Sequence, residues 1–171
     1  MKTLKPSEKN PSGTGLRPVT SFQTTRRNLP HWQQPGSIYF ITWRLKGEEM
    51  LSSEEKTTIL QSLLYWDQVK WTVHAAVVMP NHIHVIAQPL TLSDGGAVNL
   101  SEIIRSVKTY SARIINAQIG APGTFWQDER HDRIIRDEAE LLQKWQYLRQ
   151  NPVERGLASN PEEYPWLYEK S

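Results

Sequence analysis

Residues 71–88, WTVHAAVVMPNHIHVIAQ, carry the clearest structural signal in the sequence. The stretch consists of two apolar runs joined by Pro80-Asn81, a pattern typical of a tight β-hairpin. Because side chains alternate between the two faces of a strand, His82 and His84 project from the same face, with their Cα atoms roughly 7 Å apart. Two imidazole nitrogens at this spacing can bind one metal ion.

The segments on either side of the hairpin predict further strands and helices. Strands are expected where β-branched and aromatic residues cluster, and helices where a capping signal precedes apolar residues at helical spacing. The expected strands are residues 37–45, 71–79 and 82–88, with one more within 125–136, and the expected helices follow Ser52, follow Asn99 and span residues 138–150. This order predicts an α+β fold, a ferredoxin-like antiparallel sheet with helices packed on one face and the histidines on a central strand.

Composition narrows the chemistry that the chain can support. Its 171 residues are sized for one domain and include no cysteine, which excludes disulfides and thiolate ligands. A bound metal would use imidazole, carboxylate, amide or water, so Mg²⁺ or Mn²⁺ is favoured over structural zinc. No stretch approaches the roughly 20 apolar residues of a membrane span, and we expect a soluble, cytoplasmic protein without membrane contact.

Charge is unevenly distributed along the chain. Residues 1–36 carry six Lys and Arg residues and a single Glu, although the net charge of the whole chain is only +2. A basic segment rich in Pro, Gly, Ser and Thr is typical of a flexible arm, which gains affinity for DNA by releasing counterions. We therefore divide the chain into a basic arm (1–27), a central domain (28–152) and a C-terminal tail (153–171).

The second expected helix carries the candidate nucleophile, Tyr110, at the border between an apolar stripe and a polar flank that contains Arg105, Lys108 and Arg113. Attack by a tyrosine oxygen on a phosphodiester would conserve the bond energy in a protein–DNA link, so cleavage and rejoining need no nucleoside triphosphate. We expect this helix to lie across the sheet so that the Tyr110 phenol approaches the histidines. The competing tyrosine, Tyr147, is interpreted as a packing residue.

Several motifs in a fixed order resemble one family of proteins. They are RNLPHW (27–32), VMPNHIH (78–84), IRSVKTYSARIIN (104–116), FWQDE (125–129), DRIIR (132–136) and YLRQNPV (147–153). Together they resemble the REP-associated tyrosine transposases, which belong to the single-tyrosine HUH transposases of bacterial insertion sequences. The resemblance extends over about residues 26–167.

The resemblance implies an HUH-endonuclease fold, with Mg²⁺ or Mn²⁺ bound by His82 and His84. It implies that Tyr110 forms a 5′-phosphotyrosine link when single-stranded DNA is cleaved, and that the DNA recognised is a hairpin from repetitive extragenic palindromes (REP). The expected DNA-binding residues lie on the arm and around the tyrosine: Arg26, Arg27, Arg105, Lys108 and Arg113. Relatives of this kind lead us to expect a monomer or a dimer.

The third metal ligand is left open by the sequence. Some members of the wider class complete the site with an amide or carboxylate one helical turn after the tyrosine, but the residue at that position is Ile114, which cannot bind a metal. The candidates are Asn116, Gln118, His74 and Asn81.

Three other functions are compatible with the pattern. The chain could be a sequence-specific DNA-hairpin binding protein without turnover, in which the histidines are only structural. It could be a rolling-circle initiator or relaxase that shares the HUH core, although only one tyrosine is well placed. A two-histidine nucleotide phosphoesterase is the remote option, because Ile86 occupies the position of a third alternating histidine.

Overall fold

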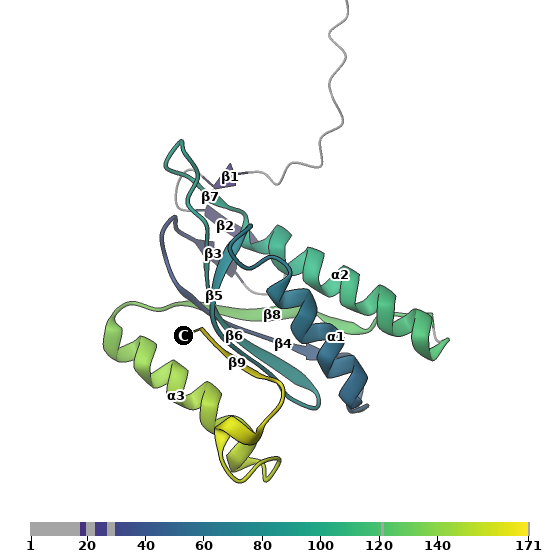
Figure 1. The fold of residues 1–171 in the computed structure, drawn as a ribbon. Helices are drawn as coiled ribbons and strands as arrows, with labels where there is room; N and C mark the ends of the chain where they lie inside the picture. Colours follow the sequence, from purple (N-terminus) through teal and green to yellow (C-terminus); the bar gives the residue numbers. More distant parts are fainter. Residues whose placement is uncertain (1–17, 20–22, 27–29, 121, 171) are drawn as a thin grey trace, which may run out of the picture.

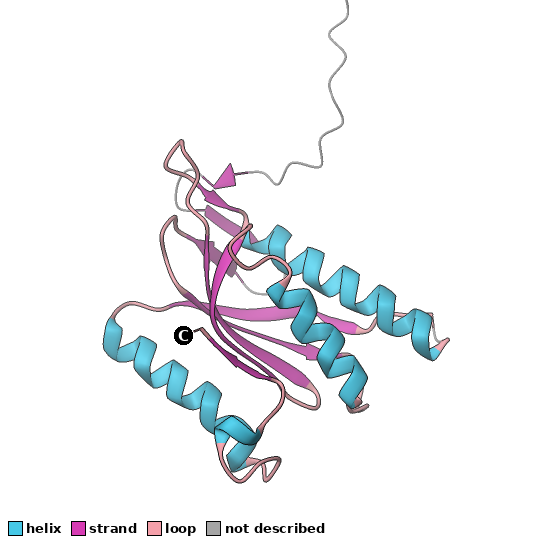
Figure 2. Cartoon of the chain, viewed as in Figure 1, coloured by secondary structure: helices cyan, strands magenta, loops and turns pink. Residues whose placement is uncertain are grey.

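A five-stranded antiparallel sheet forms the centre of the molecule (Figures 1 and 2). The computed structural model describes residues 18–19, 23–26, 30–120 and 122–170. The strand order is β8-β4-β6-β5-β9, and the bounds are Tyr39–Leu45 for β4, Trp71–Val78 for β5, His82–Pro89 for β6, Trp126–Ile134 for β8 and Leu167–Glu169 for β9. The predicted α+β class and antiparallel sheet are confirmed.

The hairpin expected from residues 71–88 is formed by β5 and β6. Val77 pairs with His84 and Val78 with Ile83, and the turn is closed by a hydrogen bond from the Met79 amide to the His82 carbonyl (2.8 Å). Because β4 pairs with the other edge of β6, the histidine strand lies in the middle of the sheet, as predicted.

Two helices, α1 (Ser53–Leu64) and α2 (Leu100–Ile119), pack on one face of this sheet (Figure 1). Both begin at the predicted capping residues, with Ser52 in a capping box and Asn99 accepting a bond from the Glu102 amide. The apolar core between helices and sheet contains fully buried side chains from both layers: Ile41, Trp43, Ile83 and Val85 from the strands, and Ile59, Leu63, Ile103 and Val107 from the helices.

The third helix, α3 (Glu138–Glu154), covers the opposite face of the sheet (Figure 1). Its Leu148 packs in a second apolar cluster with Ala75, Val77 and Ile86. The expectation that all helices pack on one face is therefore wrong. The physical reason is that the central strands carry apolar side chains on both faces, and each face must be covered to remove that surface from water.

The chain after residue 150 is part of the folded domain. Helix α3 continues through Pro152, near its C-terminal end, where the proline has no N–H to donate to a carbonyl of the preceding turn. A short 3-10 helix, η1 (Pro161–Glu163), leads into β9, which pairs with β5. The Tyr164 hydroxyl donates a hydrogen bond to the Val78 carbonyl (2.8 Å). The segment interpreted as a tail thus provides an edge strand.

Two small antiparallel ladders lie at the start of the described chain. β1 (Pro18–Val19) pairs with β7 (Ala97–Val98), and β2 (Gln23–Arg26) pairs with β3 (Pro30–Gln33). The buried Gln33 side chain joins this region to α2, since it accepts from the Leu100 amide and donates to the Val98 carbonyl. Arg27 and most of the predicted arm lie outside the described residues. No helix in the described ranges combines the length and apolar character needed to cross a bilayer.

Candidate active site at the histidine pair

The two histidines lie side by side on the sheet face that α3 covers. Their ring centroids are 4.7 Å apart, and the side chains are nearly inaccessible to solvent, with 2% of His82 and 5% of His84 exposed. The prediction that both project from one face of a central strand is confirmed. Buried imidazoles need partners for their ring nitrogens, so their hydrogen bonds define what the pair can do.

Hydrogen bonds at Nδ1 leave the two Nε2 atoms for another partner. His82 Nδ1 lies 2.7 Å from Asn81 Oδ1, and because a carbonyl oxygen only accepts, Nδ1 carries the proton and Nε2 keeps its lone pair. His84 Nδ1 lies 2.7 Å from Thr42 Oγ1. Its Nε2 is buried without a hydrogen-bond partner among the described residues. An unsatisfied buried nitrogen is costly, and a bound metal ion would satisfy it.

Both histidines are held in the neutral form that binds metals. Burial, followed by the positive charges of Arg155 and Arg44, lowers the pKa of His82 to about 4. Burial, the neighbouring His82 and the same arginines, together with Lys144, lower the pKa of His84 to about 3. Near pH 7 the pair is therefore uncharged, and each Nε2 is available as a ligand.

A tyrosine stands directly against this pair, and it is Tyr147 of α3. Its ring lies 5.3 Å from the His84 ring at 69° and 6.0 Å from the Phe40 ring at 74°. Phe40 itself stacks on His84 at 5.3 Å. Tyr147 is 45% exposed, so the side chain contacts the histidine and still reaches solvent. The interpretation of Tyr147 as a mere packing residue missed this position.

Tyr110 lies on the other side of the sheet. It belongs to α2, whose buried residues Ile103 and Val107 pack in the core cluster shared with α1, and its side chain lines a groove between those two helices. The expectation that its phenol approaches the histidines is wrong, because the histidines project toward α3. Helical periodicity locates an apolar stripe, but it does not say which face of the sheet that stripe covers.

The four candidates for a third ligand do not complete the site. Asn116 donates to the Gly123 carbonyl and Gln118 lines the α1–α2 groove, so both belong to the opposite side. Asn81 is occupied in orienting His82. Among the described residues, no three His, Cys, Asp or Glu side chains are grouped to hold a metal, which also leaves His74 apart from the pair.

Asn151 is a further candidate, because it belongs to the helix that covers the histidine face of the sheet. It lies one helical turn after Tyr147 on α3, is 3% exposed, and its Oδ1 accepts a hydrogen bond from Arg155 Nε at 3.2 Å. The positive charge of that same Arg155 also lowers the pKa of His82. The spacing of four between Tyr147 and Asn151 was the available signal, since such residues share one helix face.

The predicted DNA-binding residues on α2 are also away from the pair. Arg105 and Arg113 are exposed, and Lys108 Nζ donates to the Gln127 carbonyl at 2.6 Å. Arg26 ends β2, whereas Arg27 falls outside the described residues. The three positions on α2 are therefore separated by the sheet from the histidine face.

Three other cations surround the histidines, and sequence reasoning did not single them out. Arg44 and Arg155 act on the pKa of both histidines and Lys144 on that of His84. Lys144 Nζ lies 5.3 Å from the Phe40 ring centroid. Within the described chain none of the three forms an ion pair, so their charges are available to an anionic ligand.

Comparison with known proteins supports the fold. No protein-family model and no curated protein sequence matches the chain. Among solved structures, the chain is similar to a REP-associated tyrosine transposase bound to a REP hairpin, with a TM-score of 0.68, 19% identity, and coverage of 83% of this chain and 82% of that one. A Deinococcus radiodurans protein provisionally assigned as a transposase gives a TM-score of 0.42 at 16% identity, with 73% and 95% coverage. The first likeness confirms the predicted fold class.

Proposed function

We propose that this protein is a metal-dependent single-strand DNA endonuclease and strand transferase, in which Tyr147 forms a 5′-phosphotyrosine intermediate. The observation that carries the proposal is the contact between the Tyr147 ring and His84, at 5.3 Å, beside a buried Nε2 that has no described partner. The likeness to a hairpin-bound tyrosine transposase supports hairpin DNA of the REP type as the substrate.

The residues that would hold the metal are His82, His84 and Asn151. Two neutral imidazoles and an amide oxygen form a donor set that suits Mg²⁺ or Mn²⁺ in the absence of cysteine. When bound, such an ion supplies Lewis-acid polarisation of a phosphodiester oxygen. With Tyr147 as the nucleophile, the position one helical turn later is Asn151 instead of Ile114. The amide that some members of the wider HUH class carry one helical turn after the tyrosine is then present.

The proposed reaction exchanges one ester bond for another. The Tyr147 phenol loses its proton and its oxygen attacks the phosphorus, the bond from phosphorus to the 3′ oxygen breaks, and that oxygen departs with a proton. The 5′ phosphate stays bonded to Tyr147. Because the number of ester bonds is unchanged, attack by another 3′ hydroxyl reverses the step and joins a new strand.

The cations around the pair give the substrate a place to bind. Arg44 of β4, Lys144 of α3 and Arg155 at the C-terminal cap of α3 each lower the pKa of His84 through their positive charge. Neutral ligands surrounded by cations form a site that favours a phosphodiester over a neutral molecule. This arrangement supports a nucleic-acid substrate more strongly than a small neutral one.

A labelled hairpin oligonucleotide tests the assignment. Incubated with Mn²⁺, the protein should form a covalent adduct that carries the DNA on the 3′ side of the cut, and EDTA should prevent it. Tyr147→Phe should abolish the adduct, whereas Tyr110→Phe should still form it. Digestion with trypsin should place the DNA on peptide 145–149. An adduct that survives Tyr147→Phe and is lost in Tyr110→Phe would overturn the assignment.

A hairpin-binding protein without turnover is the second candidate. The observation that favours it is the lack of a third His, Cys, Asp or Glu side chain beside the histidines in the described part of the chain, since carboxylates strengthen the binding of hard cations. For this function, hairpin binding would be unaffected by EDTA, and neither Mg²⁺ nor Mn²⁺ would produce an adduct.

A further inference from the structure

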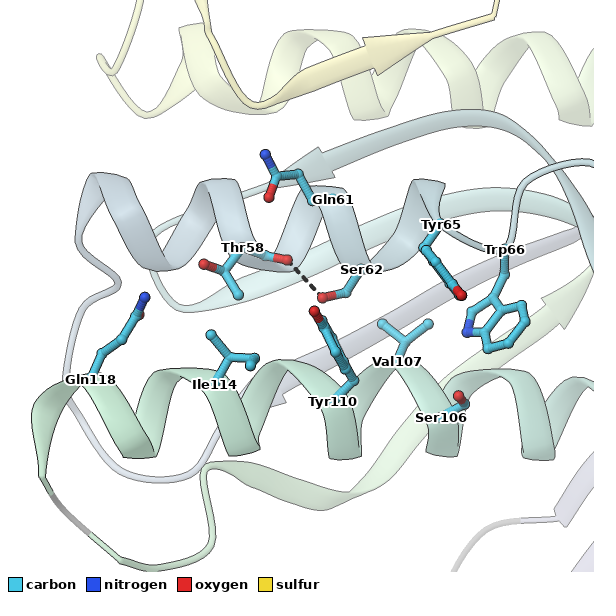
Figure 3. A pocket seen from close by; sticks show the side chains of 10 residues that line it. All are labelled: Thr58, Gln61, Ser62, Tyr65, Trp66, Ser106, Val107, Tyr110, Ile114 and Gln118. Carbon is cyan, nitrogen blue, oxygen red and sulfur yellow. Dashed lines mark hydrogen bonds between the residues drawn. The ribbon is translucent and has the colours of Figure 1, made fainter. Parts of the chain in front are cut away.

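A groove runs between α1 and α2 on the sheet face opposite the histidines (Figure 3). Its volume is about 720 Å³, and three of its lining residues are aromatic: Tyr65, Trp66 and Tyr110. Figure 3 shows the Tyr110 ring extending from α2 toward Ser62 of α1, with Tyr65 and Trp66 at one end. The proposed cleavage site makes no use of this groove.

The aromatic rings of the groove are unusually accessible. Tyr65, the C-terminal cap of α1, is 70% exposed, and Tyr110 of α2 is 50% exposed. The Tyr65 and Trp66 rings meet edge to face at 4.7 Å and 81°. Exposed aromatic faces gathered in one concavity are a common feature of ligand sites, because a ring left in water gains by being covered.

The charges around the groove indicate what could cover those rings. The ten lining side chains include no carboxylate and no cation. Cations lie at the rim instead: Lys70 Nζ is 3.2 Å from the Trp66 ring centroid, and the Arg113 guanidinium is 5.7 Å from the Tyr110 ring. A neutral aromatic floor with cations at its edge matches a nucleotide strand, whose bases stack and whose phosphates remain outside.

We propose that this groove binds unpaired bases of single-stranded DNA by stacking on Tyr65 and Tyr110. The proposal rests on the proposed function for its source of DNA, but the site is separate from the nucleophile. The groove and Tyr147 lie on opposite faces of the sheet, so the bases held in the groove belong to a different segment from the one that is cut. Tyr110 then acts in recognition, beside Arg113, which the resemblance led us to expect among the DNA-binding residues.

Photo-crosslinking locates the strand directly. The probe is a ten-nucleotide single strand containing 5-bromodeoxyuridine, and the protein is the full chain with Tyr147→Phe, so that no cleavage product forms. After trypsin digestion, peptide 57–70 contains Tyr65 and Trp66, peptide 109–113 contains Tyr110, and peptide 145–149 contains residue 147. Crosslinks to 57–70 or 109–113 are expected. Crosslinks confined to other peptides, or none at all, would overturn the proposal.

Affinity for the same unmodified strand gives a second measurement. Tyr65→Ala and Tyr110→Ala should each weaken binding roughly tenfold, since one stacking contact is lost, whereas Tyr65→Phe and Tyr110→Phe should keep the affinity close to wild type. Leu142→Ala is the matched control, because Leu142 is an exposed side chain on α3 (58%). Ala variants that bind as tightly as wild type would refute the groove, and a protein or peptide occupant would give that result.

The two proposals fail in different ways. If the hairpin assay gives no adduct while peptides 57–70 and 109–113 are crosslinked, the nuclease proposal is refuted and the groove proposal is supported. If the adduct forms on Tyr147 while the Ala variants keep full affinity, the groove proposal is refuted and the nuclease proposal is supported. Circular dichroism melting of each variant confirms that the exposed substitutions leave the fold intact.

Discussion

The unsatisfied nitrogen of His84 lowers the free energy of unfolding, so replacing this residue should make the metal-free protein more stable. The perturbation is the double substitution His84→Leu with Thr42→Val, examined in the presence of EDTA. His84 is 5% exposed and its Nε2 has no described partner, so the Leu side chain removes a buried nitrogen that costs about 1–3 kcal/mol. Changing Thr42 as well removes both partners of the 2.7 Å hydrogen bond, which is nearly neutral when both are replaced by apolar groups.

The expected net gain follows from subtracting the aromatic contacts that are lost. The stacking of His84 on Phe40 and its contact with Tyr147 contribute about 0.5–1.5 kcal/mol in pairs of this kind. The double variant should therefore be more stable than wild type by about 1 kcal/mol in the metal-free state, a rise in Tm of about 2–4 °C for a chain of this size. His84→Leu alone should gain less, because it leaves the partly buried Thr42 hydroxyl without its partner.

Urea unfolding in EDTA measures the difference, and a second series in Mn²⁺ provides the control. Mn²⁺ should stabilise wild type by binding only the folded state, and it should leave the double variant unchanged. A double variant that is less stable than wild type by more than about 1 kcal/mol in EDTA would refute the reasoning, because it would mean that His84 Nε2 is satisfied in the folded protein.

Three further predictions concern the same face of the sheet. Asn151→Ala should raise the Mn²⁺ concentration required for adduct formation at least about tenfold, whereas Asn116→Ala on the other face should leave it unchanged; equal effects in an Mn²⁺ titration would exclude Asn151 as a ligand. Lys144→Gln should weaken hairpin binding and lower the slope of log K against log salt by about 0.7–0.9, and an unchanged slope in fluorescence anisotropy would show that Lys144 is remote from the phosphates. Tyr164→Phe should lower the free energy of unfolding by about 1 kcal/mol, because the bond to the Val78 carbonyl is lost. Since burial raises the Tyr164 pKa to about 12, the stabilisation from its protonated hydroxyl is complete below pH 10 and is lost as the pH rises toward 12, so the stability advantage of wild type over the variant should shrink above pH 10 in urea titrations.

Sequence reasoning succeeded where the signal is local. The hairpin of residues 71–88 follows from two apolar runs and a Pro80-Asn81 turn, and the helix starts follow from the caps at Ser52 and Asn99. These features depend on residues that are neighbours in the chain. They also fixed the alternation that places His82 and His84 on one face, which is half of the candidate site.

The other half of the site depends on contacts between distant segments. Tyr110 was favoured because basic residues surround it on its own helix, but which face of the sheet a helix covers is decided by packing between elements far apart in sequence. Apolar residues on both faces of β6 were a sign that a second helical layer was needed. Once α3 supplies that layer, it brings Tyr147 against His84, and the proposed ligand Asn151 lies one helical turn further along the same helix.

The lack of a described acidic side chain beside the histidine pair has a thermodynamic consequence. A divalent ion held by two imidazoles and an amide keeps its full charge, and Arg44, Lys144 and Arg155 add to the same positive potential. Under the proposed function, the phosphodiester would be the counter-charge that completes the site. Ion and DNA should therefore bind with positive cooperativity, and linkage requires that each raises the affinity of the other by the same factor. The resting protein would hold its metal weakly, and the substrate itself would assemble the catalytic centre.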